Sequence, residues 1–306
     1  MTPEEKIPFV FLTSHAFSGS TLLSFLLGSH PAIATVGELT GPAYHLSLDS
    51  YYCSCGRLFQ QCPFWREVAE VVNRYQVPYS LDQYFDTRFY VNTNRLLLRL
   101  RMGSLRSNFL EAWRDKLMLS LWPGHRQEMN ERLKRNEVFA RAILDVSGKS
   151  IFLDTSKDPM RIPFLHKSER FDFYVIHLVR DVRGVVTSIL SRHPETDVQQ
   201  ATRSWLWREQ NIKRHLASIP QTRQMVVRYE DLATETLTTL NKVFAFLGLA
   251  KLDEIANFRE TENHILGNKM RKGNSAEIRL DERWRTVLSD AQLQTITQTV
   301  GVSNLG

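Results

Sequence analysis

The residues of this sequence that could do chemistry follow short apolar runs, and the first group is FSGST, Phe17 to Thr21. It stands between the apolar runs FVFL and TLLSFLL, an order that predicts a strand, a turn and a helix. Such a unit aims the free N–H groups of the first helical turn, and the positive end of the helix dipole, into the turn. Gly19 permits close approach of the backbone, and further donors are the hydroxyls of Ser18, Ser20 and Thr21. The pattern predicts a phosphate cradle.

The alternative is a purely structural turn, because strand–glycine turn–helix units also occur in α/β proteins that bind no ligand there. The stretch lacks the GxxxxGK[ST] pattern, whose lysine neutralises the outer phosphates in ATPases and GTPases. If the turn holds a phosphate, the positive charge must come from elsewhere in the chain.

Four further apolar runs place a polar side chain at or near their ends. These side chains are Glu38 in the run 33–39, Lys157 after 150–154, Arg180 after 173–179 and Tyr229 after 224–228. Strands that alternate with helices predict an α/β fold like that of P-loop NTPases, with a parallel sheet flanked by helices and ligands beyond the carboxyl ends of the strands. A carboxylate at such an end can be a general base, with a solvated loop glutamate as the alternative. The set suits transfer of a group from an anionic nucleotide donor.

Between these strand regions, residues 64–148 are predicted to form a mostly helical insertion within a single domain, 1–306. Leucines and a tryptophan recur there at a spacing of three to four, which indicates one apolar face per helix. The arginines are expected on the solvated face. A membrane-surface helix is the alternative, which Glu111 and Asp115 disfavour because they interrupt the basic face. The block is a natural place for a lid or a substrate-selecting segment.

The composition is that of an ordinary soluble globular protein. The chain has 306 residues, 42% hydrophobic and 24% charged, and its formal charge of +6 favours an acidic partner such as a nucleotide. Residues 1–8 carry no apolar core of a secretory signal, and no apolar run approaches the roughly 18 residues that span a bilayer. We therefore expect a cytoplasmic protein without a transmembrane segment, unless a leader has been removed, and no nucleic-acid partner.

All 3 cysteines, Cys53, Cys55 and Cys62, fall within ten residues of sequence. Clustered thiols suggest a metal site, but three thiolates are fewer than the four ligands of a closed zinc site. His45 could be the fourth ligand, at an unusual spacing. A disulfide is the other possibility, which a cytoplasmic setting disfavours. We expect a packed or redox-inert cluster and no metal.

The sequence resembles the sulfotransferases that use 3'-phosphoadenylyl sulfate (PAPS), over roughly residues 7–40 and 150–285. In that family a loop close to RSGTT or KSGTT follows a strand and binds the 5'-phosphosulfate, and FSGST stands in that place here. A second signature reads RDPRAxxxS with a further arginine four residues on; here it is RDVRG, then Ser188 and Arg192. The resemblance implies that Arg180 and Ser188 hold the 3'-phosphate of PAPS and of its product PAP, with Arg192 beside them.

Within this family, the layout looks most like that of tyrosylprotein sulfotransferases and their bacterial relatives. Their GE pair carries the general base, which corresponds to Glu38, and their KDP triplet carries a catalytic lysine, which corresponds to Lys157. The stretch RYEDL, which contains Tyr229, is also familiar from the family. The bacterial relatives share a CxCG…CPFW stretch and a late H…GN.MR…W segment. By resemblance that late segment folds over the nucleotide through Asn268 and Arg271.

Two positions depart from the family pattern. Phe17 stands where the family has an arginine or lysine that stabilises charge on the sulfate, and Thr40 stands where tyrosylprotein sulfotransferases have an arginine. The first departure shifts electrostatic work to Lys157, with His15 as a further candidate. The second weakens the inference of a tyrosine-peptide acceptor.

The resemblance therefore implies in-line sulfuryl transfer from PAPS to an acceptor hydroxyl, with release of PAP and without a metal. The acceptor could be a sugar, a lipid head group, a phenol or a peptide tyrosine. Two other functions stay open: a kinase or NTPase on a P-loop-like fold, and a non-catalytic protein that binds PAPS or PAP.

Overall fold

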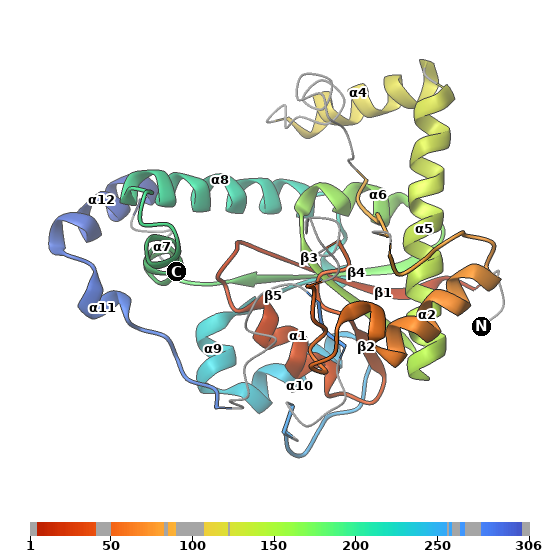
Figure 1. The fold of residues 1–306 in the computed structure, drawn as a ribbon. Coiled ribbons are helices and arrows are strands. Elements are labelled where there is room, and N and C mark those ends of the chain that lie inside the picture. Colours follow the sequence, from red (N-terminus) through yellow and green to blue (C-terminus); the bar gives the residue numbers. More distant parts are fainter. Residues whose placement is uncertain are drawn as a thin grey trace.

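A five-stranded parallel sheet forms the centre of the protein, and its strands lie in the order β2-β3-β1-β4-β5 (Figure 1). The structure is a computed structural model that describes residues 5–40, 50–82, 85–89, 107–121, 123–255, 257–258, 264–266 and 277–301. The strands are β1 (Ile7–Ser14), β2 (Ile33–Thr35), β3 (Ile151–Lys157), β4 (Phe171–Val179) and β5 (Gln224–Arg228). The predicted α/β fold with a parallel sheet is confirmed.

The central strand β1 is buried on both faces, as its almost continuous apolar sequence requires. Phe9 and Phe11 point into one hydrophobic core, while Val10 and Leu12 point into the core on the opposite face. β1 pairs with β4 from Ile7 to Ser14 and with β3 from Phe9 to Thr13. The carboxyl ends of all three strands therefore meet at one edge of the sheet.

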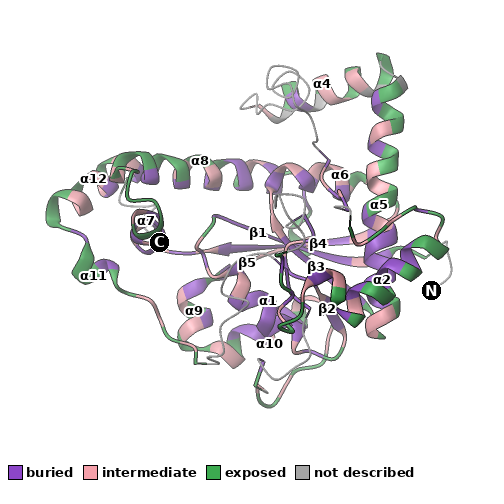
Figure 2. Cartoon of the chain, in the orientation of Figure 1, coloured by how far each residue is buried: buried purple, intermediate pink, exposed green. Residues whose placement is uncertain are grey.

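Helices cover both faces of the sheet (Figures 1 and 2). One face is packed by α1 (Ser20–Gly28), α9 (Tyr229–Thr234) and α10 (Thr236–Phe246). The other face is packed by α2 (Pro63–Arg74), α5 (Pro123–Ser147), α6 (Ile162–Lys167) and α8 (Val198–Leu216). A third cluster joins α8 to α7 (Val182–Arg192), α11 (Trp284–Val287) and α12 (Asp290–Val300). Single 3-10 turns are η2 (Phe59–Gln61), η3 (Pro159–Arg161) and η4 (Gln221–Arg223).

Within the block 64–148, the described residues form most of α2, together with α4 (Asn108–Leu121) and α5. Residues 75–82 and 85–89 within it are not helical, and Phe85 and Phe89 are buried in the core. The start of α5 and α4 extend away from the sheet (Figure 1). Phe109, Trp113 and Leu117, one turn apart along α4, are exposed. Among the described helices, none combines the length and the apolar character that a membrane crossing needs.

The predicted run 33–39 is a strand only from Ile33 to Thr35. Gly37 then takes a φ of +74°, and its N–H donates to the Thr35 hydroxyl 3.1 Å away. The chain turns there because this left-handed conformation cannot continue a strand. Glu38 therefore lies on a turn just beyond β2.

Candidate active site

The turn between β1 and α1 presents backbone donors at the start of a helix. The first hydrogen bond of α1 is donated by the Leu23 N–H to the carbonyl of Gly19, 3.1 Å away, so the N–H groups of residues 20–22 precede the helical ladder. Gly19 is the N-cap residue with φ +89°, and no side chain of the described residues caps the helix. Phe17 also has a positive φ, +68°, which non-glycine residues rarely adopt. This conformation leaves the helix start open to an anion.

The serine hydroxyls of the turn are buried beside these donors. Ser18 is 1% exposed, and its hydroxyl has no hydrogen-bond partner within the described part of the chain. A buried hydroxyl without a partner costs about 1–3 kcal/mol. Ser20 is also buried and Thr21 is half-buried. The turn thus has hydrogen-bonding capacity that the surrounding protein does not use.

Glu38 and Lys157 lie against each other, with 2.5 Å between Oε1 of Glu38 and Nζ of Lys157. They come from the ends of β2 and β3, which are neighbours in the sheet. Their side chains are 23% and 18% exposed, so both are reachable from solvent. The structure therefore brings together the carboxylate and the ammonium that the sequence placed at two separate strand ends.

The backbone around Glu38 is held by groups at the end of β3. Oδ1 of Asp154 accepts a hydrogen bond from the Leu39 N–H at 3.3 Å, and the Ser156 hydroxyl accepts one from the Thr40 N–H at 3.1 Å. The Thr155 N–H donates to the Gly37 carbonyl at 2.9 Å. Thr40, the second departure from the family pattern, is thus a buried anchor of this turn.

Asp154 is itself paired with Arg161 in the interior. Nη2 of Arg161 lies 2.9 Å from Oδ2 of Asp154, and the two side chains are 1% and 0% exposed. Arg161 also donates to Asn136 Oδ1 and to the Thr87 carbonyl. Removing one member of such a buried pair leaves an uncompensated charge, so the network holds the end of β3 firmly.

Lys157 has the unusual φ of +66°. Its carbonyl accepts a hydrogen bond from the Thr13 hydroxyl at 3.0 Å, which ties the end of β3 to the end of β1. A lysine in this left-handed conformation is strained by roughly 1–2 kcal/mol. Such strain clusters at functional sites, where the surrounding structure imposes it.

Arg180 is buried beside the turn that contains Phe17, at the start of α7. Its Nη1 donates to the Phe17 carbonyl at 2.8 Å, and its Nη2 donates to Oδ2 of Asp281 at 3.0 Å. The guanidinium also stacks over the Tyr229 ring, with its carbon 4.4 Å from the ring centroid. A Cβ at Gly184 would come within 2.9 Å of Arg180 Nε, so the Arg180 side chain packs closely on this glycine.

Ser188 lies one helical turn after Gly184, and Arg192 one turn further, on the same face of α7. The Ser188 hydroxyl donates to the Gly184 carbonyl at 2.9 Å. Arg192 is exposed at the last turn of the helix. The predicted 3'-phosphate residues therefore form a row that begins at Arg180 and runs along α7.

Tyr229 joins this row to the turn between β1 and α1. Its ring packs so closely on Gly19 that a Cβ there would lie 2.7 Å from Cδ2. Its hydroxyl donates to the Arg279 carbonyl and accepts from the Asp281 N–H, each at 3.2 Å. Burial raises the pKa of this phenol, so it stays protonated at neutral pH.

Comparison with known proteins decides the family. The family model described as "Sulfotransferase family" matches residues 8–254. This chain belongs to the sulfotransferase family. None of the curated proteins matches it.

Solved sulfotransferases share the fold of this sulfotransferase. The sulfotransferase domain from the curacin biosynthetic pathway is similar with a TM-score of 0.54 and 18% identity, over 97% of this chain and 98% of that one. The sulfotransferase domain from the Synechococcus PCC 7002 olefin synthase has a TM-score of 0.53 and 19% identity, over 97% of each chain.

The other predicted site residues of this sulfotransferase are either buried or half-buried near the turn before α1, or lie outside the described residues. The Phe17 ring is half-buried and packs against the third cluster, which is formed by α7, α8, α11 and α12. His15 is buried, and burial lowers the pKa of its imidazole. Asn268, Arg271 and His45 lie outside the described residues.

Two acidic residues of the site were missed in the sequence. Asp281 is 101 residues from Arg180 in sequence, so no local pattern connects the two residues. Hydrogen bonds from Arg283 and Arg180 hold the pKa of the Asp281 carboxyl well below its usual range. Asp154 did leave a signal, because an aspartate ends the apolar run SIFLD, where an isolated charge must find a partner.

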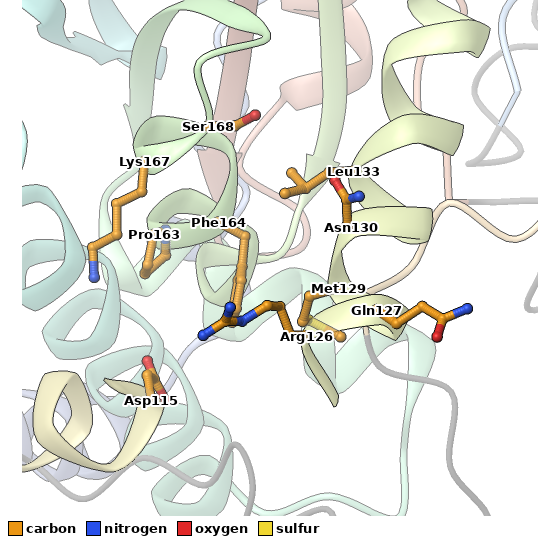
Figure 3. Close-up of a pocket in the computed structure, with 10 residues that line it drawn as sticks. All are labelled: Asp115, Arg126, Gln127, Met129, Asn130, Leu133, Pro163, Phe164, Lys167 and Ser168. Atoms are coloured by element: carbon orange, nitrogen blue, oxygen red, sulfur yellow. The ribbon is translucent and has the colours of Figure 1, made fainter. Parts of the chain in front are cut away.

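Two cavities of the described chain lie away from these residues of the sulfotransferase. One of about 610 Å³ opens between α4, α5 and α6, and Figure 3 shows Phe164, Arg126 and Met129 among the residues that line it. Another of about 470 Å³ lies beside β4 and β5 and contains the buried pair His177–Glu209. Neither is lined by a predicted site residue.

Proposed function

We propose that this sulfotransferase transfers a sulfuryl group from PAPS to an acceptor hydroxyl and releases PAP. The acceptor oxygen forms a bond to sulfur while the bond from sulfur to the 5'-phosphate oxygen breaks, and the hydroxyl proton passes to a base. The observation that supports this most is the contact between Glu38 and Lys157, 2.5 Å apart at the sheet edge where the uncapped turn before α1 also lies.

Glu38 would accept the proton of the acceptor, and Lys157 would stabilise charge on the sulfuryl oxygens and the leaving phosphate. The ion pair holds the carboxyl group of Glu38 and the ammonium of Lys157 in place before substrate arrives. The N–H groups at the start of α1, with the hydroxyls of Ser18 and Thr21, would bind the 5'-phosphosulfate.

Arg180 and Ser188 would bind the 3'-phosphate, with Arg192 and Tyr229 at the border of that site. An arginine suits this role because its guanidinium presents a planar fork of donors to phosphate oxygens. Support comes from Asp281, whose carboxylate already places an anionic oxygen 3.0 Å from Nη2 of Arg180. Asn268 and Arg271 remain proposed nucleotide contacts by family resemblance.

The direct test replaces Glu38 by glutamine, which keeps the shape and removes the basicity. With radiolabelled PAPS and a panel of sugars, phenols, lipid head groups and tyrosine peptides, the wild type should sulfate at least one class, identified by the mass shift of the product. Glu38→Gln should lower kcat about 100-fold or more with unchanged PAP affinity. Glu67→Gln, on the exposed face of α2, is the matched control and should retain wild-type turnover.

The competing functions give different results in the same assays. Turnover of ATP or GTP without PAP binding would replace the proposal with a kinase or NTPase. Tight PAP binding with no single-turnover release of PAP from PAPS, across all acceptors, would indicate a binding protein. Wild-type turnover in Glu38→Gln would move the base elsewhere, with His15 next in line.

A further inference from the structure

Three cysteines and one histidine meet at a single point away from the sulfuryl-transfer residues. The Sγ atoms of Cys53, Cys55 and Cys62 and a ring nitrogen of His264 all lie within 4.8 Å of one another. Nδ1 of His264 is 3.6 Å from Sγ of Cys53 and 3.3 Å from Sγ of Cys62, and the Sγ atoms of Cys55 and Cys62 are 3.6 Å apart. His264 is 211 and 202 residues from its two sulfur neighbours in sequence.

Three of the six separations, at 3.3–3.6 Å, are close to the edges of a zinc tetrahedron, and all six are within 4.8 Å. Bonds of about 2.3 Å to sulfur and about 2.0 Å to nitrogen separate neighbouring ligand atoms by about 3.5–3.8 Å. A disulfide would need two sulfur atoms at about 2.05 Å, and all three cysteines are free thiols. Three sulfurs and one nitrogen make a closed four-ligand set, which is typical of structural zinc sites.

The surrounding chain orients the ligands. The His264 ring is stacked on Phe64, with centroids 4.2 Å apart and planes inclined by 4°. Cys53 and Cys55 stand on a tight turn, in which the Gly56 N–H donates to the Cys53 carbonyl at 3.1 Å and Gly56 has φ +83°. Cys62 is the N-cap residue of α2. Such positioning of both thiol and imidazole groups is what a metal centre requires.

We propose that one structural Zn²⁺ ion is bound by Cys53, Cys55, Cys62 and His264. Binding displaces the three thiol protons into solvent and leaves the imidazole neutral, with no change of oxidation state. Cys55 is exposed and gives the ion a path of entry, while the other three ligands are buried. The sequence had offered His45 as the fourth ligand and favoured a cluster without metal. His45 lies outside the described residues, and the structure brings His264 to the thiols.

The centre would also hold the turn that carries Glu38, a consequence that rests on the proposed function. The segment after His264 pairs with that turn: the Leu266 N–H donates to the Val36 carbonyl at 2.7 Å, and the Glu38 N–H donates to the Leu266 carbonyl at 3.4 Å. A Cβ at Gly37 would come within 2.5 Å of the Leu266 carbonyl oxygen, so the two segments are in close contact. Zinc would thus position the general base without touching it.

Metal content tests the centre independently of activity. The chain, purified without a polyhistidine tag under reducing conditions, should contain about one zinc per chain by inductively coupled plasma mass spectrometry. Cys55→Ser, at the exposed ligand, and His264→Ala should each hold less than about a tenth of that. His215→Gln is the matched control, because His215 is equally buried but lies on α8, and it should keep the full content.

Substitution with cobalt is a second test of the metal centre, and it needs no variant. Wild-type protein stripped by chelator and reloaded with Co²⁺ should show thiolate-to-metal charge-transfer bands and the intense visible bands of tetrahedral cobalt. Absence of stoichiometric zinc in the isolated protein, together with failure of the stripped wild type to take up zinc or to give these bands, would overturn the centre. Full zinc content in both Cys55→Ser and His264→Ala would overturn this ligand set.

Discussion

Arg180 offers the sharpest test of how the nucleotide is recognised. Arg180→Ala removes a buried guanidinium that is only 6% exposed and donates to the Phe17 carbonyl and to Asp281. A charge-assisted hydrogen bond contributes about 1.5–3 kcal/mol. Because a 3'-phosphate must compete with the Asp281 carboxylate, we expect the lower end of this range, about 1.5–2 kcal/mol, or a 10- to 30-fold loss of PAP affinity.

Isothermal titration calorimetry with two ligands isolates the phosphate contribution. Adenosine 5'-monophosphate lacks the 3'-phosphate, so its affinity should fall by about twofold or less in the variant. That small loss would come from removal of the hydrogen bond between Arg180 and the Phe17 carbonyl. Arg183→Ala is the matched control: Arg183 is also an arginine of the α7 start, but it pairs with Asp181 and stacks on Trp284. Its PAP affinity should stay close to wild type. Equal losses for the two ligands in Arg180→Ala would refute the assignment of Arg180 to the 3'-phosphate.

Three further predictions concern acceptor contact, acid stability and the buried ion pair. Phe17→Ala should raise the acceptor KM and leave PAP affinity nearly unchanged in steady-state and calorimetric assays; loss of PAP binding in a folded variant would place the ring against the nucleotide instead. Burial lowers the pKa of His215 to about 4 from about 6.5 in the unfolded chain. As the pH falls, the unfolded state therefore binds the proton before the folded state does. Urea unfolding should show that the free energy of unfolding falls by up to about 3 kcal/mol between pH 6.5 and pH 4, and that His215→Gln reduces this loss. A free energy of unfolding that did not change with pH would contradict the prediction. Arg161→Met leaves the Asp154 carboxylate buried without its ion-pair partner. It should lower the free energy of unfolding by about 3–5 kcal/mol in the same measurement. A change below about 1 kcal/mol would mean that the surrounding structure rearranges to accommodate the unpaired carboxylate.

The sheet was predictable because its strands are apolar enough to be recognised one at a time. The run 173–179 became β4 (Phe171–Val179) and the run 224–228 became β5 with the predicted bounds. The strand predicted for 33–39 is shorter in the structure because Gly37 adopts a positive φ. The residues around Gly37 give no sequence signal of that conformation. The strand order also depends on pairing between distant segments, which local periodicity does not contain.

The candidate site was predictable where residues follow strands and unpredictable where contacts cross the chain. Glu38 and Lys157 could be named from strand ends, and their contact follows from the pairing of β2 with β3. Asp281 and His264 carry no such local signal, because their partners lie 101 and more than 200 residues away. Such contacts are set by tertiary packing alone.

The position of β1 at the centre of the sheet has a consequence for synthesis on the ribosome. The Thr13 hydroxyl bonds to a residue 144 positions later, and β4, the other neighbour of β1, ends only at Val179. At about 5–20 residues per second, translation leaves the emerged β1 without either neighbour for roughly 8–30 s. Its apolar side chains are available to chaperones, or to aggregation, throughout that interval. The sheet can close only after the helical block has been made, so nascent chains that stop before β4 should be captured by holdase chaperones, and longer ones released.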